Sequence, residues 1–86
     1  MYYYVYLIVT KLNKKIISYV GYTNNLKRRL TLHNTSKGAK FTRGKKWNIA
    51  YFKKYSSKIS AMKEEYLLKK NIKKRNMLKK DYLKKL

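Results

Sequence analysis

The N-terminal segment alternates with period two between residues 2 and 9, which predicts a β-strand. Both faces of this strand are apolar or aromatic, with Tyr2, Tyr4, Tyr6 and Ile8 on one side and Tyr3, Val5, Leu7 and Val9 on the other. Two apolar faces are typical of a strand that is covered on both sides. A polar stretch at residues 12–15 predicts a hairpin turn, so residues 16–22 form a second, antiparallel strand.

A short helix is predicted at residues 25–34, directly after the second strand. Thr23 or Asn24 is the expected N-cap, because a side-chain oxygen at this position accepts from a free backbone N–H. Residues 35–47 form a basic loop with two glycines. We expect these glycines to let a mobile loop follow a nucleic-acid backbone. Residues 49–55 are then the third strand.

From Ser60 the hydrophobic period becomes helical. One stripe of the helix contains a carboxylate among apolar residues: Ala61, Glu65, Leu68 and Ile72. The helical spacing of apolar residues is then interrupted and resumes at Leu78, Tyr82, Leu83 and Leu86. This predicts a second, shorter helix with Asn76 as its cap.

The element order is therefore strand, strand, helix, strand, helix, helix. This order predicts an α+β fold, in which helices flank a small three-stranded, mostly antiparallel sheet. With 86 residues, the chain is expected to form a single domain over residues 1–86.

The charge of the chain indicates a polyanionic partner. There are 24 lysines and arginines against 3 acidic residues, and the first 58 residues contain no carboxylate. Codon usage in an AT-rich genome explains the preference for lysine over arginine, but it does not explain the missing acids. Nucleic acid is therefore the expected partner.

Several classes of site are excluded by composition. The chain has no cysteine and one histidine, which rules out disulfide frameworks, zinc clusters and cysteine nucleophiles. The apolar run at residues 2–9 is too short to span a bilayer and lacks the features of a signal peptide. We expect a cytoplasmic, nucleoid-associated protein without a membrane partner.

A candidate reactive group follows the second strand. Arg29 and His33 are four residues apart, so they project from one face of the predicted helix, beside the turn that carries Tyr19 and Tyr22. Arginine neutralises charge on a phosphate, while tyrosine and histidine transfer protons. This combination suits chemistry on a phosphodiester.

These residues resemble the GIY-YIG nuclease superfamily. The similarity is carried by Tyr4-Val5-Tyr6, Tyr19-Val20-Gly21, Asn25-Leu26 and Arg28-Arg29, with Tyr4 in place of the usual glycine. The continuation through His33-Asn34, residues 38–44, Ala61, Glu65 and Lys69 is similar to a small stand-alone bacterial subgroup, the YhbQ-like UPF0213 proteins. The resemblance covers residues 3–70.

The resemblance implies a metal-dependent phosphodiesterase that uses Mg²⁺ or Mn²⁺. It implies that Tyr6 or Tyr19 activates the attacking water, that Arg29 contacts the scissile phosphate, and that Glu65 holds the metal ion. His33 matches a position that is filled by histidine or tyrosine in relatives.

Three further positions are marked by the resemblance. Asn34 and Thr42 match positions near the family's site, without an assigned role. Tyr22 replaces a lysine of the excision-repair branch, so a proton relay through that lysine is absent.

The small number of acidic residues limits how many metal ions the site can hold. Only Glu64, Glu65 and Asp81 are available, so a two-metal cluster is not expected, whereas one hydrated Mg²⁺ needs only one carboxylate. Glu65 on the apolar stripe is expected to face inward, although an ion pair with Lys69 is the alternative. Glu64 is expected to be an exposed, ion-paired residue.

The expected function is that of a metal-dependent DNA endonuclease, structure-selective or weakly sequence-specific, in repair or recombination. The expected substrate is branched, single-stranded or duplex DNA, and a protein partner can add specificity. The expected backbone contacts are Arg28, Lys40, Arg43, Lys45 and Lys46. Trp47 either belongs to the edge of the core or stacks on bases with Phe41. The alternatives are a catalytically inactive binding protein and a basic ribosome- or nucleoid-associated protein.

Overall fold

The computed structural model describes residues 1–85. Its elements, in chain order, are β1 (Tyr3–Leu12), β2 (Lys15–Thr23), α1 (Leu26–Asn34), a 3₁₀ turn (Lys40–Thr42), β3 (Asn48–Tyr55), α2 (Lys58–Lys70) and α3 (Ile72–Lys84). The order ββαβαα and the α+β class agree with the prediction. The 3₁₀ turn lies inside the segment that was predicted to be an irregular loop.

The three strands form one antiparallel sheet in the order β2-β1-β3, so β1 is the central strand. The β1–β2 connection is the predicted hairpin. Its two turn residues, Asn13 and Lys14, both have positive φ angles of 50° and 70°. Such angles match the twist of the flanking strands.

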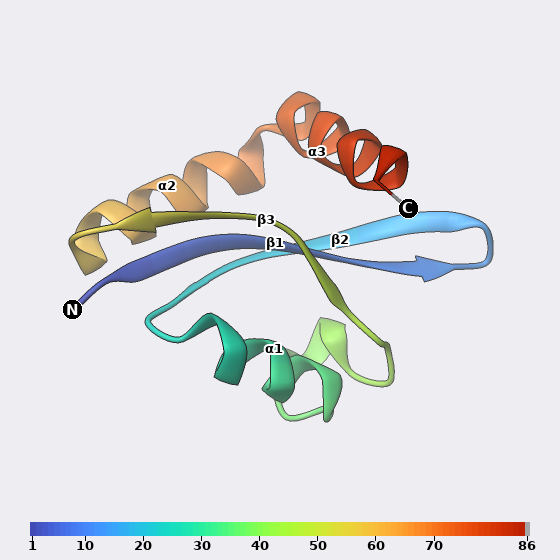
Figure 1. The fold of residues 1–86 in the computed structure, drawn as a ribbon, viewed down its shortest axis with the longest axis horizontal. Helices are drawn as coiled ribbons and strands as arrows, with labels where there is room; N and C mark the ends of the chain where they lie inside the picture. The colour runs from blue at the N-terminus through green and yellow to red at the C-terminus, as the bar shows by residue number, and fades with distance from the viewer. Residues whose placement is uncertain (86) are drawn as a thin grey trace.

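The helices cover the two faces of the sheet unequally (Figure 1). Helices α2 and α3 lie against one face, and α1 with the 3₁₀ turn lies against the other. We name these the α2 face and the α1 face. Val5, Leu7 and Val9 pack on the α2 face, and Tyr6 and Ile8 pack on the α1 face.

The period-two pattern of β1 is therefore confirmed, because alternate residues enter separate clusters. The pairing also corrects one expectation. Tyr22 is opposite Val5 and packs in the α2-face cluster, so it does not join Arg29 and His33. Alternation along β2 separates Tyr22 from Tyr19, which packs in the α1-face cluster.

The N-cap of helix α1 lies one or two residues later than predicted. Asn25, and not Thr23 or Asn24, is the N-cap, since its side chain accepts from the backbone N–H of Arg28 at 3.1 Å. The hydroxyl of Thr23 in turn accepts from the backbone N–H of Asn25 at 3.1 Å, which fixes the turn before the helix.

The break between the last two helices is also earlier than predicted. Asn71, and not Asn76, caps α3, so α3 has 13 residues, as α2 does, and is not the shorter helix. Ile72 is consequently exposed rather than buried on the stripe. Leu86 lies outside the described residues.

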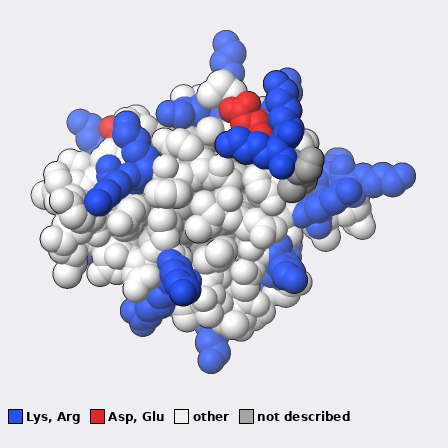
Figure 2. All heavy atoms as spheres, viewed as in Figure 1, with Lys and Arg blue, Asp and Glu red and all other residues white. Residues whose placement is uncertain are grey.

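Positive side chains are numerous on the face of the molecule that Figure 2 shows. Figure 2 shows lysines and arginines around the outline of one face, with an uncharged area across its middle. None of the helices in residues 1–85 has the length and apolar character needed to cross a lipid bilayer.

Candidate active site

Tyr6 is the centre of the candidate site. It lies on the central strand, is 2% exposed, and is directly opposite Gly21 of β2. A Cβ atom at position 21 would collide with the Tyr6 hydroxyl. Gly21 therefore provides the space in which the phenol reaches the edge of the α1 face.

His33 of α1 is fully buried and forms a hydrogen bond with the phenol of Tyr6. Its Nε2 is 2.9 Å from the Tyr6 hydroxyl oxygen, and its Nδ1 is 2.9 Å from Thr42 Oγ1. Thr42 donates its only hydroxyl proton to the Ala39 carbonyl at 2.7 Å. Thr42 must then accept from His33 Nδ1–H, which leaves the Nε2 lone pair to accept the Tyr6 proton.

Arg29 completes this group from the preceding turn of α1. Its Nε donates to the Tyr6 hydroxyl oxygen at 3.4 Å. The Tyr6 oxygen thus accepts from a fixed cation while it donates to a neutral imidazole. This arrangement favours removal of the phenolic proton at the moment when negative charge develops on the oxygen.

The protonation states at neutral pH follow from burial. Burial, together with the nearby Arg29 charge, lowers the pKa of His33 to about 4, so the imidazole is neutral. Burial also raises the pKa of Tyr6, against the lowering effect of Arg29, so the phenol keeps its proton at rest. The resting site is therefore a protonated tyrosine that is hydrogen-bonded to a neutral histidine.

Tyr19 and the loop form the wall beside His33. The Tyr19 ring lies 5.3 Å from the His33 ring, edge to face, and stacks on Phe41 with 6.1 Å between ring centroids. Gly38 packs against the other side of His33, where a Cβ atom would approach Nδ1 to 2.6 Å. Gly38 therefore shapes the histidine pocket, a role that the sequence did not predict.

Glu65 lies on α2, which covers the opposite face of the sheet from Arg29 and His33. Its side chain is 18% exposed, which fits the expected inward orientation, and it also forms the alternative ion pair with Lys69 at 3.4 Å. After burial, the negative charge of Glu65 makes a minor contribution to the raised pKa of Tyr6.

A hard divalent cation requires oxygen ligands, and the side chains that contact the Tyr6 hydroxyl, Arg29 and His33, supply none. No cluster of three His, Asp or Glu side chains occurs in residues 1–85. Glu65 can supply one carboxylate, and substrate phosphate and water must supply the rest. This donor set fits one hydrated Mg²⁺ or Mn²⁺.

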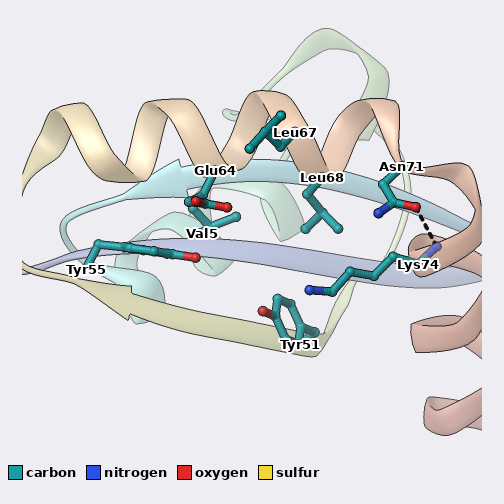
Figure 3. Close-up of a pocket in the computed structure, with 8 residues that line it drawn as sticks. All are labelled: Val5, Tyr51, Tyr55, Glu64, Leu67, Leu68, Asn71 and Lys74. Atoms are coloured by element: carbon teal, nitrogen blue, oxygen red, sulfur yellow. Dashed lines mark hydrogen bonds between the residues drawn. The ribbon is translucent and has the colours of Figure 1, made fainter.

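Glu64 departs from its predicted exposed ion pair. It is half-buried in a cavity of about 330 Å³ between α2, α3 and β3. Figure 3 shows Glu64 above Tyr55 and Lys74 beside Tyr51. The pKa of Tyr55 is raised mainly by burial and next by the negative charge of Glu64. This cavity contains none of the side chains around Tyr6.

The predicted backbone contacts lie on α1 and the loop that follows it: Arg28, Lys40, Arg43, Lys45 and Lys46. All are exposed except Lys45, which is half-buried. Lys45 donates to the Phe41 carbonyl at 3.1 Å and lies 5.4 Å above the Phe41 ring. These residues therefore present their charge on the α1 side of the molecule.

Two supporting residues had no role assigned from sequence. Thr42 fixes the tautomer of His33, as described above, and Asn34 pairs with both the backbone N–H and the carbonyl of Trp47. Trp47 itself is buried and donates to the Thr42 carbonyl at 3.0 Å, so it belongs to the core and is not a base-stacking residue. Phe41, by contrast, is 52% exposed.

The antiparallel sheet and the Tyr6, Arg29 and His33 group define a GIY-YIG type of domain. The GIY-YIG catalytic domain model matches residues 2–80, and the chain belongs to this family. No solved structure matches the chain significantly.

The chain is also similar to bacterial proteins of the UPF0213 group. It is 54% identical over 52 residues to UPF0213 protein OB0043 of Oceanobacillus iheyensis, covering 59% of this chain and 60% of that protein. It is 46% identical over 52 residues to a UPF0213 protein of Streptococcus pneumoniae, covering 59% and 52%. It is 40% identical over 67 residues to UPF0213 protein SH2523 of Staphylococcus haemolyticus, covering 77% and 78%. In the first two, the match spans less than two thirds of the relative.

Proposed function

We propose that this protein is a metal-dependent endonuclease that hydrolyses phosphodiester bonds in DNA. The observation that carries the proposal is the hydrogen-bonded chain from Arg29 through the Tyr6 hydroxyl to His33 Nε2. The family match supports nuclease chemistry, and the net charge of +21 supports a nucleic-acid substrate.

In the proposed reaction, Tyr6 is the general base. A water molecule attacks phosphorus and gives its proton to the Tyr6 oxygen while the Tyr6 proton passes to His33 Nε2. The bond from phosphorus to the leaving oxygen breaks, and that oxygen takes a proton from solvent. Arg29 stabilises the negative charge on Tyr6 and on the scissile phosphate. A divalent ion held by Glu65 would supply further positive charge to the phosphate oxygens.

We further propose that the enzyme acts on DNA structure more than on sequence, in repair or recombination at the nucleoid. The exposed lysines and arginines support this, since such side chains bind phosphates and do not distinguish one base from another. A protein partner can then supply specificity that the chain lacks.

The test is cleavage of labelled linear, single-stranded and branched DNA with Mg²⁺, with Mn²⁺ and with a chelator. We expect cleavage only with metal, loss of cleavage in Glu65→Gln, and little change in the neighbouring Glu64→Gln. The unmutated protein failing to cut any of these substrates with either metal would favour the inactive binding protein instead.

A further inference from the structure

An open end of the α1 face carries exposed aromatic side chains. Helix α1 lies under the middle of the sheet, and the end where β1 begins and β3 terminates extends past it (Figure 1). Tyr2 is 51% exposed and Phe52 is 55% exposed in this region, and Tyr4 between them is half-buried. Tyr4 and Phe52 do not belong to the cluster that packs against α1.

The strand register places this open end beside Tyr6, on the side away from Gly21. Phe52 is directly opposite Tyr6 across β1 and β3, and Lys54 is directly opposite Tyr4. Directly opposite residues share a face of the sheet. The Tyr4 and Phe52 rings meet edge to face at 6.2 Å, which confirms that they share this surface.

A lysine completes the surface. Lys54 Nζ lies 3.8 Å from the centroid of the Tyr2 ring, closer than any other recorded lysine–aromatic contact of residues 1–85. We name Tyr2, Tyr4, Phe52 and Lys54 the aromatic platform. At about 3.3 Å per strand residue, it extends roughly 13 Å from Tyr6.

We propose that the aromatic platform stacks unpaired nucleobases of the strand whose phosphate lies at Tyr6 and Arg29. This inference rests on the proposed function and adds a substrate class to it. Stacking on aromatic rings tolerates any base, and lysine provides the accompanying phosphate contact. Bases inside a duplex are already stacked, so the platform selects unpaired strands.

The charge of the molecule decides between possible occupants of this surface. A second copy of the chain would bring another +21 of charge against the same lysines, which opposes self-association. A polyanion with flat apolar groups satisfies both the rings and the charge. Single-stranded nucleic acid has that combination.

The experiment measures binding to 2-aminopurine-labelled single strands and to matched duplexes, in chelator so that no cleavage occurs. The test variant is Phe52→Leu, which keeps an apolar side chain on β3 but removes the aromatic face. The matched control is Tyr66→Leu on α2, since Tyr66 is also 55% exposed and has Lys70 4.4 Å over its ring.

We expect Phe52→Leu to weaken single-strand binding roughly tenfold and to reduce the fluorescence quenching of 2-aminopurine, because a stacked base is lost. Duplex affinity should change less than about twofold, and Phe52→Trp should restore single-strand binding. Equal losses in Phe52→Leu and Tyr66→Leu, or equal losses on single strands and duplexes, would overturn the platform.

The experiments distinguish a failure of the aromatic platform from a failure of the nuclease proposal. If the unmutated protein cuts DNA but Phe52→Leu binds single strands normally, the platform is wrong and the nuclease proposal stands. If Phe52→Leu selectively loses single-strand binding and nothing is cut with either metal, the platform stands without the nuclease.

Discussion

The two faces of the central strand are built from adjacent residues but contain different chemistry. On the α2 face, Val5, Leu7 and Val9 enter an apolar cluster closed by Ala61 and Leu68. On the α1 face, the buried groups include a phenol, an imidazole and a hydroxyl. One strand thus serves as the wall of a hydrophobic core and as the support of a polar site.

The difference shows how a small domain can afford a buried polar group. Burying polar atoms is unfavourable unless they are hydrogen-bonded, and Tyr6, His33 and Thr42 satisfy one another in a chain. Apolar clusters on both faces contribute to the free energy of folding, but only the α1 face also contains this polar chain. Mutations on the two faces should therefore affect different measurements.

The largest effect is expected for Tyr6→Phe, which removes the proposed base and keeps the ring. Cleavage in a single turnover should slow by roughly 10² to 10⁴-fold. Tyr19→Phe removes a hydroxyl from the other motif tyrosine, which has no recorded hydrogen bond to His33, and should slow cleavage much less. The reverse ranking would make Tyr19 the base.

Arg29→Ala should slow cleavage by roughly 10² to 10³-fold, because one donor to developing negative charge is lost. Arg28→Ala removes the same charge from the adjacent, exposed position and serves as the control. Single-turnover rates and equilibrium binding are measured at one salt concentration. Similar rates in both variants would mean that Arg29 contributes only to binding.

Leu7→Ala tests the other face of the same strand. Leu7 is 0% exposed, so truncation should lower the free energy of unfolding by about 2 to 5 kcal/mol. Leu12→Ala, at a position that is 46% exposed, should cost less than about 0.5 kcal/mol. Urea unfolding gives both values. The cleavage rate per folded Leu7→Ala molecule should stay close to that of the unmutated protein.

The same contrast explains what the sequence could predict. Alternation along β1 identified the strand and its two covered faces, because period two is a local property. The i, i+4 spacing of Arg29 and His33 placed them together on α1 for the same reason. Tyr22 was misplaced because proximity in sequence to Tyr19 hides the alternation of faces along β2.

Contacts between distant segments were not accessible to this reasoning. Thr42 holds His33 across nine residues, and Gly38 fits against the imidazole only because the loop folds back over α1. Glu64 was assigned to solvent because its neighbour Glu65 occupied the inward stripe, whereas the cavity beside β3 exists only in the folded chain. The cap of α3 was missed because Asn71 and Asn76 are both suitable capping residues.

A dependence of stability on pH is expected from the buried histidine. The pKa of His33 falls from its ordinary 6.5 to about 4 in the folded protein, so between these values the unfolded chain binds a proton that the folded chain does not. Stability is therefore complete above pH 6.5 and decreases as the pH falls toward 4. The total loss corresponds to about 3 kcal/mol.

Urea unfolding at pH 4, 5, 6 and 7 measures this loss directly. The background is low, because the chain has only three acidic side chains. His33→Gln is less stable at every pH, since glutamine cannot reproduce both ring hydrogen bonds, but it removes the titrating group. Its free energy of unfolding should therefore depend much less on pH. A slope in His33→Gln equal to that of the unmutated protein would show that other groups cause the acid sensitivity and that the buried histidine is not its source.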